Sequence, residues 1–226
     1  MTRLKLSPSI LTADFARLGD EVRSVEPFVD WFHLDVMDGH YVPNLTFGPS
    51  TVEAVRRSCG LPLHVHLMIE DPLHYAASFI EAGAERVSFH PEVVDDVAEV
   101  IGHIKDRGGG AGLAVHPDVD VDEVAPHLGH LDVLLMMTVR PGFGGQSFLH
   151  EVVPKIRRAR ELVAVAGADA DIEVDGGVNL STVDEAVEAG AEIVVAGSAV
   201  FDGTDPVAAA RRMRERLDQL EKRAES

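Results

Sequence analysis

Apolar runs and amphipathic stretches alternate along the whole chain, and this alternation is the strongest constraint on its fold. The apolar runs read as buried strands at 4–10, 31–37, 62–68, 86–90, 111–115, 132–139, 171–175 and 192–196. Helical patterns occupy 14–26, 49–58, 72–82, 93–107, 120–129, 150–166, 181–189 and 205–222. Such alternation builds right-handed βαβ units around a parallel sheet. We therefore predict an α/β protein, a (β/α)8 TIM barrel forming a single domain over residues 1–226 with its last few residues frayed; a doubly wound open sheet is the alternative.

Charge and cysteine content narrow the choice of partners and compartment. The 38 acidic residues outnumber the 20 lysines and arginines, and the formal net charge is −18. This excess argues against nucleic acid or an anionic membrane surface as a partner, because both select basic patches. Cys59 is the single cysteine, so a disulfide within the chain is impossible. The first residues are too short and polar for a signal peptide, and we expect a cytoplasmic protein without membrane contact.

Polar side chains at the ends of the predicted strands are the candidates for chemistry. Active sites of such barrels lie at the carboxyl ends of the strands, and residues two apart on a strand share a face. The polar residues at these ends are Ser7, Ser9, His33, Asp35, His64, His66, Ser88, His90, Glu173 and Asp175. Of these, His33, Asp35, His66 and Asp175 make a two-imidazole, two-carboxylate set suited to Zn²⁺, Mn²⁺, Fe²⁺ or Co²⁺. His64 lies one layer deeper, and we expect a supporting role for it.

Glycine-rich turns follow the late strands and suggest where an anion binds. "DGG" at 175–177 and "AGS" at 196–198 come after the seventh and eighth strands, where barrels commonly bind phosphate through backbone N–H groups. Gly176, Gly177, Gly197 and Ser198 fit that placement, and a neutral cradle of this kind suits an acidic protein. "RPGFGGQSF" at 140–148 predicts a mobile lid, or else a tight turn. Met37, Met68 and Met137 fill the core or form an apolar wall against a substrate.

Six stretches, in order over nearly the whole chain, resemble the signature sequences of the ribulose-phosphate 3-epimerase family. They are "SPSILTADFARLG" at 7–19, "HLDVMDGHYVPNLTFGP" at 33–49, "VHLMI" at 65–69, "PGFGGQSF" at 141–148, "VDGGVN" at 174–179 and "AGSAVF" at 196–201. The resemblance implies a barrel of the ribulose-phosphate-binding type, a divalent metal and a pentulose phosphate substrate. The chain departs from the pattern of many members at His116 and Arg140, beside the mouth.

The resemblance also implies a role for individual residues. It assigns the metal to His33, Asp35, His66 and Asp175, and the two acid/base roles to Asp35 and Asp175. It assigns substrate contacts to Ser9, His66, Gly142, Phe143, Gly144, Gly145, Asp175, Gly176, Gly177, Gly197 and Ser198. The expected cofactor is one divalent ion, Zn²⁺ in the first place, with Fe²⁺, Mn²⁺ and Co²⁺ as alternatives. We also expect a homo-oligomer, because barrels of this type often associate.

The implied reaction interconverts D-ribulose 5-phosphate and D-xylulose 5-phosphate in the pentose phosphate pathway. Inversion at C3 needs a base on one face of a 2,3-enediolate and an acid on the other, and a Lewis acid for the charge that develops at C2. Our hypothesis is that Asp35 removes the proton from D-ribulose 5-phosphate and Asp175 returns one.

Other functions remain open on the sequence alone. A 3-epimerase of a hexulose 6-phosphate such as D-allulose 6-phosphate would use the same residues. A barrel that forms a Schiff base would need a lysine at a strand's carboxyl end, and Lys5, Lys105, Lys155 and Lys222 all lie elsewhere. A non-catalytic barrel that binds a sugar phosphate would not need two opposed aspartates.

Overall fold

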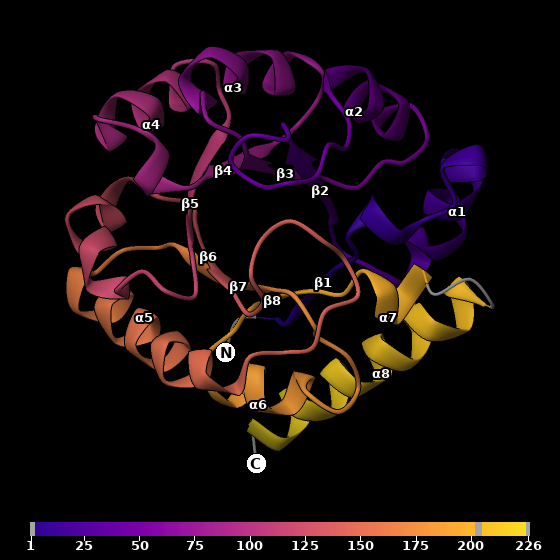
Figure 1. Ribbon diagram of the computed structural model, residues 1–226. Helices are drawn as coiled ribbons and strands as arrows, with labels where there is room; N and C mark the ends of the chain where they lie inside the picture. Colours follow the sequence, from indigo (N-terminus) through magenta and orange to yellow (C-terminus); the bar gives the residue numbers. More distant parts are fainter. Residues whose placement is uncertain (1–2, 202–204, 225–226) are drawn as a thin grey trace.

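The computed structural model describes residues 3–201 and 205–224, and within them eight parallel strands form the wall of a barrel (Figure 1). Helices surround this wall on the outside, as the view along the barrel shows. The predicted single-domain (β/α)8 barrel is thereby confirmed. The strands are β1 Lys5–Ser7, β2 Phe32–Met37, β3 Leu63–Met68, β4 Arg86–Phe89, β5 Gly110–Val115, β6 Val133–Met137, β7 Asp171–Asp175 and β8 Ile193–Val195.

From β2 to β8 each strand pairs with its neighbour in the sequence, and β8 pairs with β1. Between β1 and β2 the barrel is closed by a short parallel contact, a bridge of Ser9 with His33 in which the His33 N–H donates to the Pro8 carbonyl. In β2 and β3, Asp35 lies directly opposite His66. This register brings two of the predicted metal ligands side by side at the carboxyl end of the barrel.

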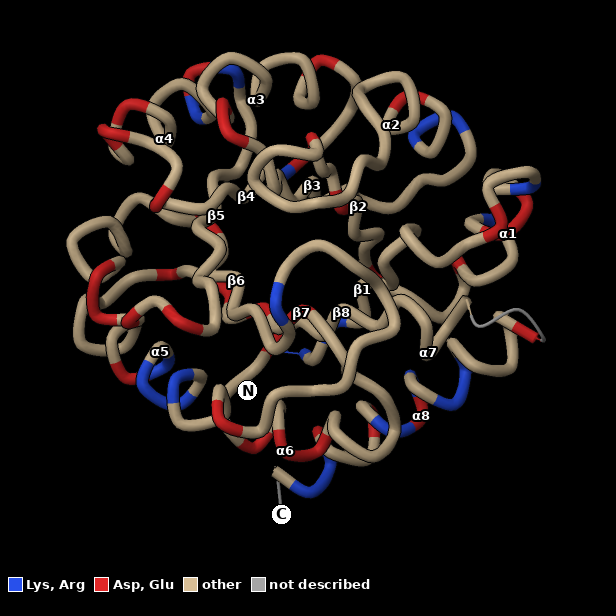
Figure 2. Tube along the Cα trace, in the orientation of Figure 1, with Lys and Arg blue, Asp and Glu red and all other residues tan. Residues whose placement is uncertain are grey.

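The helices form the outer ring, and most of the charged residues lie on this ring and its connections (Figure 2). The α-helices are α1 Leu18–Val25, α2 Pro49–Arg56, α3 Pro72–Glu81, α4 Val97–Lys105, α5 Val153–Ala166, α6 Val183–Glu188, α7 Ser198–Phe201 and α8 Pro206–Ala224. Short 3-10 segments are η1 Ile10–Thr12, η2 Phe15–Arg17, η3 Glu26–Phe28, η4 Pro91–Val93, η5 Val121–His130 and η6 His150–Val152.

The main hydrophobic core lies between the strands and the helices. All six residues of β2 and of β3 are buried, because one face packs on the helices and the other fills the barrel. On the inward face of these strands the chain places His33, Asp35, His64 and His66 instead of aliphatic residues. Burying so many titratable groups is costly unless each finds a partner, so this layer is the place to look for function.

Two local differences from the sequence prediction have physical causes. Strand β1 ends at Ser7 instead of residue 10, because Pro8 has no N–H to donate and η1 begins at Ile10. The segment predicted as a helix at 120–129 is the 3-10 segment η5, which contains Pro126. A proline inside a helix removes one bond and clashes with the preceding turn, which disfavours the α form. Helix α7 is an additional short element.

The last helix, α8, continues to Ala224. Residues 1–2, 202–204 and 225–226 lie outside the described residues, so the expectation of a frayed end remains a prediction where it falls on 225–226. Within 3–201 and 205–224, no helix combines the length and the apolarity needed to cross a membrane.

Candidate metal centre and substrate pocket

Four buried side chains from three strands converge at the carboxyl end of the barrel. They are His33 and Asp35 on β2, His66 on β3 and Asp175 on β7, and one ligand atom from each lies within 4.8 Å of all the others. His33 Nε2 is 3.3 Å from Asp35 Oδ1 and 3.8 Å from Asp175 Oδ2. His66 Nδ1 is 3.2 Å and 3.7 Å from the same two oxygens. The structure thus brings together all four residues proposed from the sequence.

The donor set fits a divalent cation. Two imidazole nitrogens and two carboxylate oxygens face one point, a mixture that suits Zn²⁺ and its first-row neighbours. His33 Nε2 is buried and makes no hydrogen bond within the described residues. An imidazole nitrogen without a hydrogen-bond partner, aimed at two carboxylates, is what a metal ligand presents before the ion binds.

A buried carboxylate beneath the cluster orients its histidines. Glu173 Oε1 is 3.0 Å from His33 Nδ1, and Oε2 is 2.8 Å from His64 Nδ1. His64 Nε2 in turn is 2.7 Å from the Ser88 hydroxyl. With its Nδ1–H donated to Glu173, His33 has the tautomer that leaves the Nε2 lone pair facing Asp35 and Asp175. Carboxylates in this position fix ring orientation and strengthen a histidine as a ligand.

The two aspartates of the cluster have different electrostatic surroundings. Burial and the neighbouring Asp35 charge both raise the pKa of Asp175 above its ordinary value. Burial acts in the same direction on Asp35, but His33 and His66 outweigh it and hold the pKa of Asp35 well below the usual range. Ser9 Oγ also donates a hydrogen bond to Asp35 Oδ2 at 2.5 Å. The two carboxyl groups therefore differ in proton affinity although they share one site.

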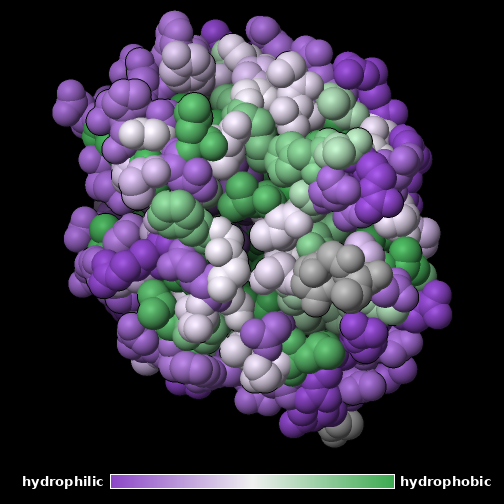
Figure 3. Space-filling model, turned by 45° about the vertical axis from the view of Figure 1, so that its right-hand side comes forward, coloured by the Kyte–Doolittle hydropathy of each residue, from purple (hydrophilic) through white to green (hydrophobic). Residues whose placement is uncertain are grey.

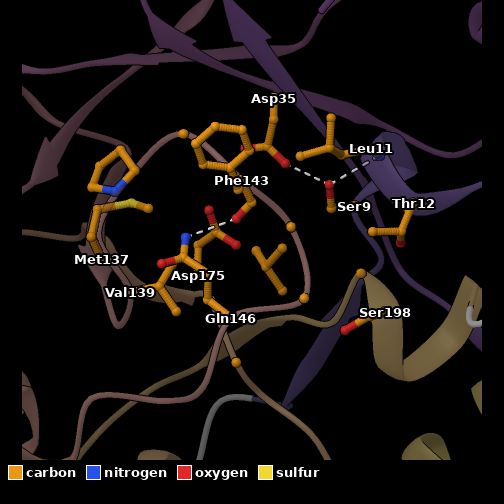
Figure 4. A pocket seen from close by; sticks show the side chains of 18 of the residues that line it. Ser9, Leu11, Thr12, Asp35, Met137, Val139, Phe143, Gln146, Asp175 and Ser198 are labelled. Carbon is orange, nitrogen blue, oxygen red and sulfur yellow. Dashed lines mark hydrogen bonds between the residues drawn. The ribbon is translucent and has the colours of Figure 1, made fainter. Parts of the chain in front are cut away.

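A pocket opens directly above the cluster (Figure 4). In the space-filling view, hydrophobic and near-neutral side chains surround a narrow hollow (Figure 3). The pocket brings together residues from the strand ends and from three glycine-rich turns. Among its lining residues are Ser9, Asp35, Met37, Met68, Met137, Gly142, Phe143, Gly144, Gly145, Asp175, Gly176, Gly177, Gly197 and Ser198. His33 and His66 contribute to the cluster below and do not line this pocket.

Two glycines after β7 are required by the backbone itself. Gly176 has φ +116°, and a Cβ there would lie 2.2 Å from Val139 Cγ2. Gly177 has φ +67°, and a Cβ there would lie 2.3 Å from the Phe148 backbone nitrogen. Any side chain would push the β7 turn away from the loop after β6. Glycine is therefore required at both positions for the close packing of this pocket wall, whether or not these residues bind a ligand.

The loop 140–148 lies over the mouth of the barrel, as Figure 1 shows for the connection after β6. Gln146 Nε2 donates hydrogen bonds to the carbonyls of Arg140 and Phe143, and Asn44 Nδ2 donates one to the Gly142 carbonyl. Phe143 lines the pocket and is 55% exposed. The loop is positioned where a lid over the pocket would lie, and its mobility remains a prediction.

The two residues at which we expected a departure from the family pattern, His116 and Arg140, lie outside the pocket lining. Arg140 pairs with Asp118 on the surface, which offsets its positive charge. His116 Nδ1 accepts a hydrogen bond from the Asp118 backbone N–H at 3.1 Å. Neither side chain contacts the cluster in the structure.

Sequence reasoning found the four cluster residues but gave Glu173 no role. The signal was present, because Glu173 precedes Asp175 by two residues on β7, as His64 precedes His66 on β3. What the alternation could not show is that one carboxylate bonds two histidines on neighbouring strands. Leu11, Thr12 and Gln146 also line the pocket and were not predicted.

Replacing Glu173 with glutamine should weaken binding of a divalent ion by about 10- to 100-fold, the usual cost of losing the partner of a ligating histidine. The glutamine amide oxygen can accept a hydrogen bond from only one of the two rings, His33 or His64. Its NH₂ group faces the other ring and cannot accept one. A competition titration against a chromophoric chelator measures the change. The exposed Glu99→Gln variant on α4 is the matched control, and equal affinity in both variants would contradict the orienting role.

The fold and the cluster together define a class of protein: a TIM-barrel protein with a buried histidine–aspartate cluster that can hold a metal ion, beneath a pocket at the carboxyl ends of its strands. Comparisons with known proteins are more specific. Residues 5–201 match the model of the ribulose-phosphate 3 epimerase family. The ribulose-phosphate 3-epimerase of Bacillus subtilis is 48% identical over 204 residues, covering 89% of this chain and 94% of that protein. The corresponding protein of Mycobacterium leprae is 44% identical, covering 93% of this chain and 94% of its own length.

The chain belongs to the ribulose-phosphate 3-epimerase family. The resemblance proposed from the sequence is thereby confirmed. The solved structure of KGPDC from Streptococcus mutans superposes with a TM-score of 0.74, over 96% of this chain and 98% of that one. At 15% sequence identity this likeness shows a shared barrel fold and nothing further.

Proposed function

We propose that this chain is a metal-dependent 3-epimerase that interconverts D-ribulose 5-phosphate and D-xylulose 5-phosphate through a 2,3-enediolate. One observation carries the proposal: two carboxylates from β2 and β7 face the same point beside two histidines, directly beneath a pocket. Family membership over residues 5–201 supplies the substrate class.

The proposed metal ligands are His33, Asp35, His66 and Asp175. A divalent cation at this point supplies positive charge that stabilises the negative oxygen of an enediolate, the term that commonly dominates such catalysis. We propose Zn²⁺, because histidine nitrogens and carboxylate oxygens are among its usual ligands. Fe²⁺, Mn²⁺ and Co²⁺ suit the same donors.

Asp35 and Asp175 are the proposed acid/base pair. They approach from strands β2 and β7, so a flat enediolate between them would meet one carboxyl group on each face. In the direction from D-ribulose 5-phosphate, Asp35 takes the C3 proton and Asp175 returns a proton to the opposite face. The reverse reaction exchanges these roles. Ser9, which hydrogen-bonds Asp35, orients the first of the two carboxylates.

The phosphate is proposed to bind among Gly176, Gly177, Gly197 and Ser198, at the turns after β7 and β8. These residues line the same pocket as the two aspartates, and turns in this position commonly bind phosphate in TIM barrels. Backbone N–H groups can bind a phosphate without a basic side chain. Such a site suits a protein whose net charge is −18. Residues Gly142–Gly145, which include Phe143, are proposed to cover the pocket from above. His66 is proposed to lie beneath the sugar.

The relatives compared above are pentulose-phosphate enzymes by name, and no feature of the pocket favours a hexulose 6-phosphate. The proposed reaction places the chain in the pentose phosphate pathway and in the cytoplasm, where sugar phosphates of that pathway are found. A homo-oligomer remains a proposal that rests on the behaviour of similar barrels.

The test is a direct comparison of substrates on purified protein of known metal content. Each of D-ribulose 5-phosphate and D-allulose 6-phosphate is supplied, and the C3 epimer formed is quantified. We expect a higher kcat/KM on the five-carbon substrate. A higher value on the six-carbon substrate would keep the mechanism and change the substrate, and no epimer from either would overturn the proposal.

A further inference from the structure

The second histidine of the cluster, His66, has a partner that the proposed mechanism does not use. Its Nδ1 faces Asp35 and Asp175, and its Nε2 points the other way, 2.9 Å from Nε2 of His90. His90 is the residue immediately after β4 and is fully buried. The two rings lie with their centroids 5.1 Å apart.

The contact between the two Nε2 atoms can hold only one hydrogen, so the tautomer of one ring determines that of the other. If His66 binds a cation through Nδ1, its single N–H is at Nε2, and it donates to His90. His90 must then accept at Nε2 and carry its own hydrogen at Nδ1. A cation bound at His66 Nδ1 would therefore dictate the tautomer of His90, a residue outside the cluster.

A carboxylate lies near the nitrogen that would carry this second hydrogen. His90 Nδ1 is buried and makes no hydrogen bond within the described residues, and Glu92 Oε1 is 3.4 Å from it. Glu92 belongs to η4, and its Oε1 accepts a hydrogen bond from the Tyr41 hydroxyl at 2.8 Å. The Tyr41 ring also packs against His90, with centroids 4.8 Å apart. The Glu92 carboxylate and the Tyr41 ring thus both lie against the imidazole behind His66.

We propose that His90, packed against Glu92 and Tyr41, is a positioning residue that keeps His66 in the tautomer whose Nδ1 binds the cation. The arrangement parallels the one at His33, where Glu173 accepts directly from the ring. At His66 an imidazole stands between the ligand and the carboxylate, and Glu92 lies toward the rim with a side chain 33% exposed. The proposal rests on the proposed metal site.

The tautomers can be observed without any mutation. In protein labelled with ¹⁵N at histidine and loaded with diamagnetic Zn²⁺, long-range ¹H–¹⁵N spectra distinguish Nδ1–H from Nε2–H rings. The expected result is His66 protonated at Nε2 and His90 protonated at Nδ1. A His90 ring protonated at Nε2 would overturn the proposal.

Variants at position 90 test the consequence for binding. His90→Phe keeps a ring of similar shape and removes the acceptor, and the dissociation constant for Zn²⁺ should rise by about 10- to 100-fold. His90→Gln offers an amide oxygen as acceptor and should recover part of that loss, which a purely structural role would not predict. His103→Gln, a partly buried histidine on α4 outside the cluster, is the control and should bind as the parent protein does.

The outcomes separate this proposal from the metal site on which it rests. Affinity unchanged in a folded His90→Phe protein, with one ion bound by the parent protein, would refute only the role of His90. A parent protein whose Zn²⁺ binding is insensitive to His33→Gln would refute the metal site as well. If His90→Phe does not fold, the spectra of the parent protein decide the question.

Discussion

Replacing Asp175 with asparagine is expected to lower kcat for epimerisation by about 10⁴-fold or more while leaving the barrel folded. Loss of a positioned acid or base alone costs about 10²- to 10⁴-fold. The amide also lacks the negative charge that Asp175 would offer a cation together with Asp35. Asparagine has nearly the same shape, so the surrounding packing should hold. Steady-state kinetics with D-ribulose 5-phosphate, alongside circular dichroism, measures both effects.

Asp35→Asn should show a loss of the same order, because the reaction requires a group on each face. Asp118→Asn is the matched control, since Asp118 lies near the mouth, outside the pocket lining, and pairs with Arg140. It should keep nearly full activity. An Asp175→Asn enzyme within about tenfold of the parent kcat would refute the two-carboxylate mechanism.

Removing divalent metal should lower activity by about 10³-fold, the second large effect that we expect. A cation is worth several kcal/mol of transition-state stabilisation in reactions that develop charge on oxygen, and about 4 kcal/mol corresponds to 10³-fold. Without the ion, two carboxylates remain close together in a buried site. The metal-free protein should therefore also unfold at a lower temperature than the loaded one.

The measurement is activity and thermal unfolding after chelation, then after addition of one equivalent of Zn²⁺, Mn²⁺, Fe²⁺ or Co²⁺. Activity should return with at least one of them. His33→Gln, which removes a proposed ligand, should regain little activity at the same ion concentration. Full activity in protein shown to contain no bound metal would contradict the proposed role of the cation.

The barrel could be predicted from the sequence because a repeated βα unit leaves a local signal in every segment. Strands such as β2 and β3 are short runs of apolar residues whose bounds the structure changes by one residue. The prediction was wrong at places where a single residue overrides the alternation of apolar and amphipathic segments. Pro8 ends β1 early, and Pro126 converts a predicted helix into the 3-10 segment η5.

The candidate site was predictable as a set of side chains and not as a network. Period-two alternation shows that His33 and Asp35 share a face, but not which atom of each ring points at the neighbouring carboxylate. The bonds from Glu173 to two histidines depend on the register between strands far apart in the sequence. The contact of His66 with His90 depends likewise on the pairing of β3 with β4. Such registers follow from barrel closure, which no single segment encodes.

The central claim is that two different carboxyl groups move the proton at C3, and one isotope experiment tests it most directly. The enzyme converts D-ribulose 5-phosphate in D₂O, and the first few per cent of product and the remaining substrate are analysed by NMR. The account predicts D-xylulose 5-phosphate with deuterium at C3 from its first appearance. In the Asp175→Asn variant, exchange at C3 of D-ribulose 5-phosphate should persist through Asp35 while epimerisation is lost. Product from the parent enzyme that retains the original C3 hydrogen would mean that one group carries the proton between faces, and would contradict the account.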